Sequence, residues 1–390
     1  MFLHRIKLKN ILSMGPSGQD LALKPLNVLI GPNGSGKSNL IEVIGLLQAA
    51  PENLHKTIRE GGGVTNWVWR GDPRGTFAEI EVLVSHESTS SIRYKLCFYE
   101  VDQRFRIHSE SLCEVSTDRN PDPIPYFDAG TDKVFLLNED SRDNKDGFAQ
   151  KVVSSRPDQS VFTFVKAPEY RVLTFTGAQF QRIRLYREWA FGRRAPLRLP
   201  QPADLPNDEL MEDGTNLGLV LNRLKRDHPK ASDRLLEELH QLYDGIEAID
   251  VSIEGGTVQL FLREGDKTVP ATRLSDGTLR YICLLAVLCH PDPPPLVCLE
   301  EPELGLHPDL LPGLADLLRE ASERTQLIVT THSDVLVDKL TDEPDSVVIC
   351  EKLDGQTQLR RLDSDDLNHW LDRYSLGELW TKGELGGNRW

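Results

Sequence analysis

The sequence has few cysteines, no long hydrophobic run and no excess of positive charge, and each lack excludes a class of protein. The six cysteines among 390 residues include no CxxC pair, which disfavours a disulfide framework or a zinc site and favours buried, reduced thiols. No apolar stretch approaches the length that spans a bilayer. The opening residues, MFLHRIKLKN, alternate as a strand does, unlike a signal peptide. We therefore expect a cytoplasmic protein with no membrane partner.

The charge balance argues against general binding to nucleic acid. The chain carries 45 basic and 60 acidic residues, a net charge of −15, and contacts to phosphate need local positive charge. One segment, residues 179–198, offers a possible DNA contact through Arg182, Arg184, Arg187, Arg193, Arg194 and Arg198. The alternative is that these arginines pair with the acidic residues that follow them, Asp204, Asp208, Glu209, Glu212 and Asp213.

The length suits two or three domains with a sizeable core. Alternating residues from 76 to about 107 predict an antiparallel β arm, and residues 116–156 read as loop apart from a strand at 133–137. We predict a helix from Gln181 to Trp189, then a proline-rich connector. Further elements are predicted as helices at 216–226, 231–243, 279–288 and 310–323, a hairpin around residues 255–256, and strands at 26–30, 296–299, 326–330 and 346–351.

A phosphate-binding loop follows the first of these buried strands. Residues 31–38 read GPNGSGKS, a full match to GxxxxGKS, and residues 38–47 have helical spacing. Glycine-rich backbone amides form an anion-binding nest, Lys37 can reach the β- and γ-phosphates, and the Ser38 hydroxyl can coordinate Mg²⁺. The predicted nucleotide-binding residues here are Gly31, Pro32, Asn33, Gly34, Ser35, Gly36, Lys37, Ser38 and Asn39.

Two further strands end in polar residues. The apolar run LVCL is followed by Glu300 and Glu301, and the run LIVT leads to His332 in a Thr-Thr-His-Ser turn. One carboxylate can join a Mg²⁺ shell and the other can polarise an attacking water. His332 is placed to contact a γ-phosphate.

The segment Leu274-Ser-Asp-Gly-Thr278 lies just before an apolar helix and the acidic strand. Ser275, Asp276 and Gly277 would sit at a helix N-terminus, where free amides and the dipole favour phosphate. Taken alone, this segment is equally well explained as an ordinary helix cap.

The order GPNGSGKS, LSDGT, LEEPELGLHP, TTHS resembles the ABC-type ATPase heads of the SMC, RecF and OLD grouping, especially "predicted ATPases" with EEPE-GLHP. The resemblance covers essentially the whole chain. It implies an α/β P-loop NTPase fold with a mixed sheet, an antiparallel β arm (about 76–175) and a helical insertion. The expected division is an N-terminal half of the head (1–178), an Arg-rich helical insertion (179–244) and a C-terminal half (245–390).

The same resemblance implies roles for the residues. Ser275 to Gly277 become the signature, Leu304 to His307 the D-loop, and His332 the switch histidine. Glu301 becomes the catalytic base, assisted by Lys37, and Ser38 with Glu300 hold the metal. The cofactors are ATP and Mg²⁺. In such heads the signature of one chain caps ATP held by another, which implies an ATP-bound homodimer or a higher oligomer.

Some features depart from the family pattern. Glu300 stands where many ABC proteins have Asp. Gln179 and Gln181 are candidates for the Q-loop glutamine, and an ordinary surface glutamine is an equally good interpretation of each. We expect no coiled coil, since no heptad repeat is present, and no Toprim nuclease module. The acidic run of Asp363, Asp365 and Asp366 is better read as a helix cap.

The leading hypothesis is an ATP-hydrolysing dimerisation switch in DNA repair or anti-phage defence, controlling a separately encoded nuclease or toxin. An ABC transporter motor is one alternative, and recovery with membranes would favour it. A nucleotide-gated scaffold with very slow hydrolysis is the other, although the presence of Glu301 and His332 disfavours it.

Overall fold

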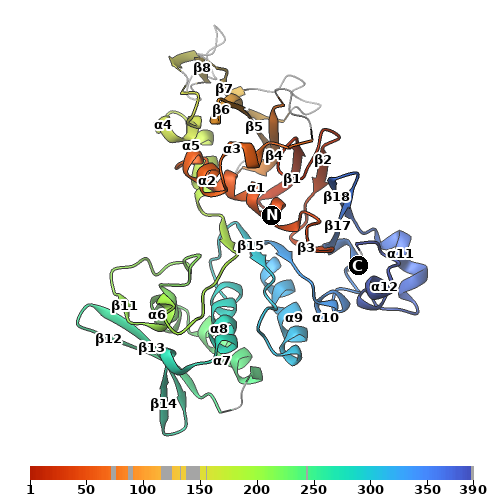
Figure 1. The fold of residues 1–390 in the computed structure, drawn as a ribbon. Coiled ribbons are helices and arrows are strands. Elements are labelled where there is room, and N and C mark those ends of the chain that lie inside the picture. The colour runs from red at the N-terminus through yellow and green to blue at the C-terminus, as the bar shows by residue number, and fades with distance from the viewer. Residues whose placement is uncertain are drawn as a thin grey trace.

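The structure is a computed structural model of the chain, and it describes residues 1–71, 76–86, 91–115, 125–131, 133–137, 150–154, 156–242 and 245–387. Two large sheets and a smaller one organise these residues. Figure 1 shows the antiparallel sheet at one end of the molecule, the mixed sheet in the middle and a hairpin arm at the other end.

The largest sheet has eight strands and is antiparallel throughout. Buried and half-buried residues alternate along strand β4 (Ala78–Ser85), whose sequence is AEIEVLVS, as expected where one face of a sheet covers a core. In spatial order the strands are β2 (Gln19–Ala22), β1 (Leu3–Lys9), β4 (Ala78–Ser85), β5 (Ser91–Val101), β6 (Arg104–Glu114), β7 (Pro125–Ala129), β8 (Lys133–Leu137) and β9 (Gln150–Ser154).

The second sheet has six strands and is mixed. Five strands are parallel, and the last pairs antiparallel with its neighbour. All five residues of the β3 run LNVLI are buried, because parallel strands are covered on both faces. In spatial order the strands are β10 (Arg184–Tyr186), β15 (Leu296–Glu300), β16 (Gln326–Thr330), β3 (Leu26–Ile30), β17 (Val347–Leu353) and β18 (Gln356–Arg361). The predicted α/β fold with a mixed sheet is confirmed.

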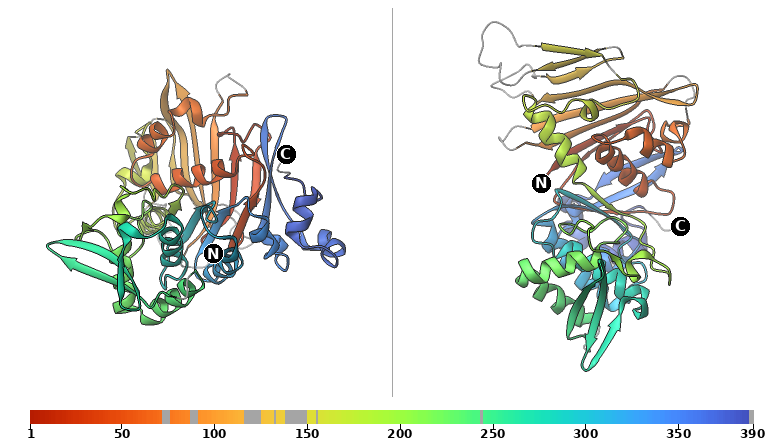
Figure 2. Two further views of the ribbon diagram at one scale, coloured as in Figure 1. Left: turned by 60° about the horizontal axis from the view of Figure 1, so that its bottom comes forward. Right: turned by 90° about the vertical axis from the view of Figure 1, so that its left-hand side faces the viewer.

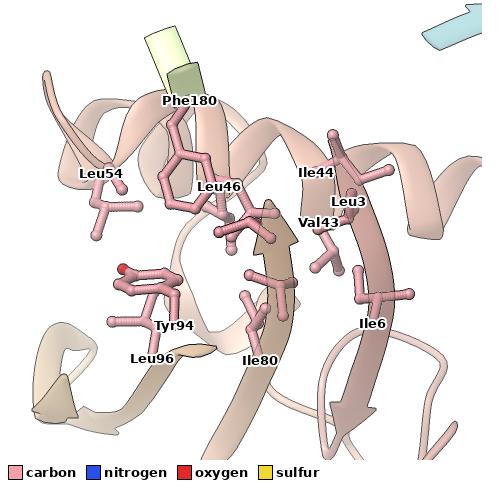
Figure 3. Packing of buried hydrophobic residues seen from close by; sticks show 14 of the residues in the cluster. Leu3, Ile6, Val43, Ile44, Leu46, Leu54, Ile80, Tyr94, Leu96 and Phe180 are labelled. Atoms are coloured by element: carbon pink, nitrogen blue, oxygen red, sulfur yellow. The ribbon is translucent and has the colours of Figure 1, made fainter. Parts of the chain in front are cut away.

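Helix α1 (Lys37–Ala49) lies between the two sheets. Its residues Val43, Ile44 and Leu46 belong to one buried cluster with Ile80 of β4 and Cys298 of β15. Figure 3 shows α1 lying across the strands, with Phe180 and Tyr94 closing the same cluster. Burying each such side chain stabilises the fold by about 1.5 to 3 kcal/mol. Smaller helices lie along this half: α2 (Leu54–Glu60), α3 (Val64–Trp67), α4 (Val161–Phe164) and α5 (Arg171–Gln181).

The opposite face of the mixed sheet is covered by a second cluster. Val297 and Leu299 of β15 alternate with the residues that face α1, and they pack with the apolar α8 run around Ile282. The helices of this side are α8 (Asp276–Leu288), α9 (Leu311–Ser322), α10 (Asp334–Asp338), α11 (Ser364–Leu371) and α12 (Leu376–Lys382). The phosphate-loop helix and the signature helix therefore lie on opposite faces of one sheet.

The chain between β10 and β15 forms a lobe that projects from the mixed sheet, as Figure 2 shows in its right-hand view. It contains α6 (Leu217–Asp227) and α7 (Pro229–Leu242), which pack on each other and on α8. A small sheet extends beyond them, made of β11 (Gln201–Pro202), β12 (Ala248–Glu254), β13 (Thr257–Glu264) and β14 (Lys267–Pro270). The predicted hairpin at residues 255–256 is confirmed.

Two secondary-structure predictions are wrong. The segment predicted as a helix from Gln181 to Trp189 contains strand β10, which pairs in parallel with β15. The segment predicted as loop, residues 116–156, also contributes β7 and β9 to the antiparallel sheet. Residues 116–124, 132, 138–149 and 155 of that segment lie outside the described residues. In both places the sheet partner, and not the local pattern, decides the conformation.

The expectations for the cysteines and for the cap at Asp363 hold. All six cysteines lie in the described residues and are free, and five of them are buried. Burial raises the pKa of the Cys350 thiol to about 12, so this sulfur stays protonated. Asp363 caps α11 by accepting a hydrogen bond from the Asp365 amide at 2.9 Å. Among the described residues, no helix is long and apolar enough to cross a membrane.

Candidate active site

The predicted catalytic and phosphate-binding residues that follow β3, β15 and β16 lie at one edge of the mixed sheet. Strands β3, β15 and β16 are parallel neighbours, so their carboxyl ends meet at the same edge. The phosphate loop follows β3, Glu300 and Glu301 lie at the end of β15, and His332 follows β16. Ligands of open α/β sheets bind at this edge.

The phosphate loop is folded around its lysine. Lys37 is 6% exposed, and its ammonium donates to the carbonyl oxygens of Gly31 at 2.8 Å and Pro32 at 3.1 Å. Burial lowers the pKa of Lys37, against the opposing effect of nearby carboxylates that include Glu301 and Glu300. Asn33 and Gly34 are exposed at the tip. The lysine is thus held inside the loop with its charge directed to the loop interior.

Chain segments that are distant in sequence brace this loop from outside. Thr357 of β18 is fully buried and donates to the carbonyl oxygen of Ser35 at 2.7 Å. The Ser13 hydroxyl contacts the Thr357 hydroxyl at 2.6 Å and accepts from Asn39 at 2.6 Å. A Cβ atom on Gly36, whose φ is +103°, would lie 2.1 Å from the Thr357 hydroxyl. Glycine is therefore required here for both reasons.

Ser38 and Glu300 are in direct contact. The Ser38 hydroxyl donates to Oε1 of Glu300. The other oxygen of Glu300, Oε2, accepts from Nε of Arg187 at 3.0 Å, and Arg187 also contacts Glu42 of α1 at 3.2 Å. The two predicted metal ligands are thus adjacent, and Arg187 holds Glu300 through the oxygen that does not contact Ser38.

Glu301 has an unusual backbone conformation. Its φ is +46°, a left-handed region that costs a non-glycine residue about 1 to 3 kcal/mol. Its amide donates to the carbonyl oxygen of Thr330 at 3.0 Å, and its Oε1 lies 3.6 Å from Nε2 of His332. The strand therefore ends in a turn that directs Glu301 toward the histidine.

Glu303 supports this turn, although nothing within the EEPE motif set it apart in the sequence analysis. Its Oε1 accepts from the Thr331 hydroxyl at 2.6 Å and from the His332 amide at 2.8 Å. Burial raises the pKa of Glu303, although these hydrogen bonds act against the shift. Among the described residues, its Oε2 is buried without a hydrogen-bond partner. Glu303 fixes the backbone that carries His332.

The predicted signature lies at the start of α8. Ser275 caps the helix by accepting from the Thr278 amide at 3.0 Å, so the helix-cap interpretation is confirmed. Ser275 and Asp276 are nevertheless exposed. A Cβ atom on Gly277 would lie 2.7 Å from the carbonyl oxygen of Gly305, so the signature loop packs tightly against the segment predicted as the D-loop.

Arg198 holds the signature loop from the interior of the protein. It is 4% exposed and donates to the carbonyl oxygens of Phe191 at 2.7 Å, Ala271 at 3.0 Å and Leu274 at 2.6 Å. It also contacts the Asp276 carboxylate. Its interpretation as a nucleic-acid contact is therefore corrected, because its donors are already used inside the protein.

The remaining arginines do not form one basic patch. Arg182 and Arg184 both pair with Glu209, at 3.1 and 2.8 Å, and Arg187 pairs with Glu300. The pairing alternative describes these residues, with partners partly different from those expected. Arg193 and Arg194 are exposed.

The two candidates for the Q-loop glutamine have different surroundings. Gln181 contacts Glu52 at 3.5 Å, and Gln179 borders a cavity lined also by Lys24 and Arg324. Arg187, which follows β10, reaches Glu300. Its strand was predicted as helix, so sequence reasoning placed Arg187 with a surface patch.

The residues present fit a nucleoside triphosphate with Mg²⁺. Among the described residues, the buried Ser35 hydroxyl has no hydrogen-bond partner, and it lies in the glycine loop beside a buried ammonium group. Such a loop suits an anion with several acceptor oxygens. Ser38 and Glu300 would supply two oxygen ligands, the donor set that Mg²⁺ takes while keeping several waters.

Solved structures with a similar fold are heads of Smc proteins. One, the Smc head bound to the C-winged helix domain of ScpA, has a TM-score of 0.61 at 15% identity and covers 95% of this chain and 100% of that chain. Another, a Pyrococcus furiosus Smc head with an extended coiled coil bound to the C-terminal domain of ScpA, has a TM-score of 0.58 at 14% identity and covers 95% and 98%. At this identity the likeness shows a shared fold.

Comparison with family models gives a second finding. Residues 26–338, well over half of the chain, match the model described as "AAA domain, putative AbiEii toxin, Type IV TA system". No curated protein sequence matches the chain. The matched range includes the phosphate loop, the acidic strand and His332. The chain therefore belongs to this AAA-domain family of P-loop ATPases.

Proposed function

We propose that the protein is an ATP-hydrolysing switch whose nucleotide sites are completed between two copies of the chain. The observation that carries this proposal is the signature loop. Arg198 and the Gly277–Gly305 contact hold this loop firmly, yet Ser275 and Asp276 are exposed. A helix N-terminus that begins at an exposed serine suits a phosphate that arrives on another molecule.

Each residue has a defined task in this proposal. Lys37 and the amides of the phosphate loop bind the phosphates, and Ser38 with Glu300 orient the metal. Glu301 accepts the proton of the attacking water, and His332 donates a hydrogen bond to the terminal phosphate. When bound, Mg²⁺ supplies positive charge that offsets the charge of the phosphate oxygens.

The Glu301–His332 contact of 3.6 Å supports these paired roles. Loss of the terminal phosphate would remove the hydrogen-bond partner of His332, so the state of the site would change with hydrolysis.

The wider role proposed is a conformational output in DNA repair or anti-phage defence. Closure of the pair would be read by a separately encoded effector such as a nuclease or toxin. The toxin–antitoxin wording of the family model and the ScpA-bound Smc head support a partner-controlled switch. Direct DNA contact would fall to Arg193 and Arg194.

The test is to stop hydrolysis without disturbing binding. Glu301→Gln keeps a side chain of the same size but removes the base, so ATP with Mg²⁺ should trap a dimer measurable by light scattering. Lys37→Ala is the matched control and should stay monomeric, because it lacks the phosphate-binding charge. A Glu301→Gln protein that stays monomeric in saturating ATP and Mg²⁺ would refute the shared site.

A further inference from the structure

The Glu300 carboxylate is held from two sides. Its Oε1 accepts from the Ser38 hydroxyl, and its Oε2 accepts from Nε of Arg187 at 3.0 Å. The Glu300 side chain is 17% exposed and that of Arg187 is 31% exposed. One oxygen therefore faces the proposed metal ligand Ser38, and the other is occupied by a charged donor.

Arg187 is itself fixed at its other end. Its Nη2 contacts Oε1 of Glu42 at 3.2 Å. Glu42 lies on α1, Glu300 ends β15, and Arg187 follows directly after β10. The guanidinium group thus ties together the phosphate-loop helix, the acidic strand and the entry to the lobe.

The length of the glutamate explains why such a contact is needed. A glutamate has one more rotatable bond than an aspartate, so its carboxylate loses more conformational freedom when it is held in one place. A guanidinium fork restricts orientation better than a point charge does, because its donors lie in a fixed plane. Mutation of a group that orients a metal ligand typically lowers metal affinity by about 10- to 100-fold.

We propose that Arg187 is a positioning residue for Mg²⁺, which holds Glu300 so that Oε1 and the Ser38 hydroxyl face one ion. This inference rests on the proposed ATPase function. It assigns Arg187 to the metal site rather than to nucleic acid. Arg187 does not contact the nucleotide in this role and acts through Glu300.

If the Arg187–Glu300 contact were an ordinary ion pair, mutation of Arg187 would have different effects. Partly exposed pairs contribute little to stability, and a purely structural Arg187 would affect melting without changing the response to Mg²⁺. A positioning Arg187 would change the Mg²⁺ response and leave Mg²⁺-free nucleotide binding intact. A Mg²⁺ titration therefore distinguishes the two roles.

The experiment measures binding of a fluorescent mant-ATP to the full chain, first in EDTA and then across a Mg²⁺ titration. Arg187→Gln should bind the probe in EDTA within about twofold of the unaltered protein, but should need about 10-fold more Mg²⁺ for half-maximal response. Arg187→Lys keeps the charge and loses the fork, so it should remain impaired and provides a second folded variant.

A double-mutant cycle tests the route of action. In a Glu300→Gln background, Arg187→Gln should produce no further change, because the group through which it acts is gone. An unchanged or improved Mg²⁺ response in Arg187→Gln would overturn the proposal, as would full recovery in Arg187→Lys or additive effects in the cycle. If the unaltered protein binds no mant-ATP, the proposed function itself fails, which is a distinguishable result.

Discussion

The phosphate loop and the signature loop are both held by contacts within the chain, but they differ in how far the chain encloses them. The phosphate loop is enclosed by its own chain: Thr357 and Ser13 brace it, and Lys37 is buried within it. The signature loop is anchored by Arg198 and packs against Gly305, and its Ser275 is exposed. In the proposed shared site, one half is complete within a chain, whereas the other half meets a second copy.

This contrast explains how a single copy can bind nucleotide without completing the proposed catalytic site. In the proposed switch, nucleotide binding depends on the phosphate loop, whereas closure of the pair depends on the signature loop. Changes in the first region should abolish binding, and changes in the second should spare binding but prevent pairing. The following changes address that separation, beginning with the largest expected effect.

Lys37→Ala removes the buried ammonium of the phosphate loop. We expect nucleotide affinity to fall by about 100-fold or more. A charge-assisted contact to phosphate contributes about 1.5 to 3 kcal/mol, and Lys37 would contact both the β- and the γ-phosphate. Isothermal titration with ATP measures the loss. Retention of near-normal affinity would show that the loop does not work as described.

Arg198→Ala removes the anchor of the signature loop. Three backbone carbonyls would lose a buried donor, and each buried acceptor left unsatisfied costs about 1 to 3 kcal/mol of stability. Urea unfolding measures this. Arg194→Ala is the matched control at an exposed position and should stay within about 0.5 kcal/mol. Equal effects for the two variants would contradict the assignment of Arg198.

Gly277→Ala tests the close contact with Gly305. The added Cβ would lie 2.7 Å from a backbone oxygen, so the signature loop must move, at a cost of about 1 to 3 kcal/mol. ATP binding should persist while ATP-dependent pairing weakens. Gly192→Ala, where the added Cβ meets nothing within 4 Å, should pair normally. Normal pairing by Gly277→Ala would argue against a role for this contact.

The smallest effect is expected from Arg193→Glu with Arg194→Glu. These side chains are exposed, so stability and ATP binding should not change. If they contact DNA, affinity should fall and the salt dependence should become shallower by about two phosphate contacts. Fluorescence anisotropy across a salt series measures both, and an unchanged affinity would remove DNA contact by these residues.

Sequence patterns located the polar residues at the strand ends well and the arginine that contacts them poorly. GPNGSGKS, the Glu300–Glu301 pair and His332 each follow a buried apolar run, and parallel strands bring such ends together. Arg187 and Glu300 are 113 positions apart, and the local pattern of QRIRLYREW suits a helix as well as a strand. Only the pairing of β10 with β15 places Arg187 at the site.

Charge clustering along the sequence was also a poor guide to exposure. Arg198 and Arg194 lie in the same arginine-rich segment, yet one is 4% exposed and the other is exposed. The difference arises because Arg198 meets the carbonyls of Ala271 and Leu274, which are distant in sequence. Strands β7 and β9 were missed for a similar reason, since their pairing partners define them.

The central claim is tested most directly by mixing two variants that are each inactive alone. Lys37→Ala lacks a working phosphate loop, and Ser275→Arg blocks the signature. A dimer with one copy of each retains one intact composite site, so random pairing should restore about a quarter of the unaltered ATPase rate. No recovery over the sum of the separate variants would contradict a site shared between two copies.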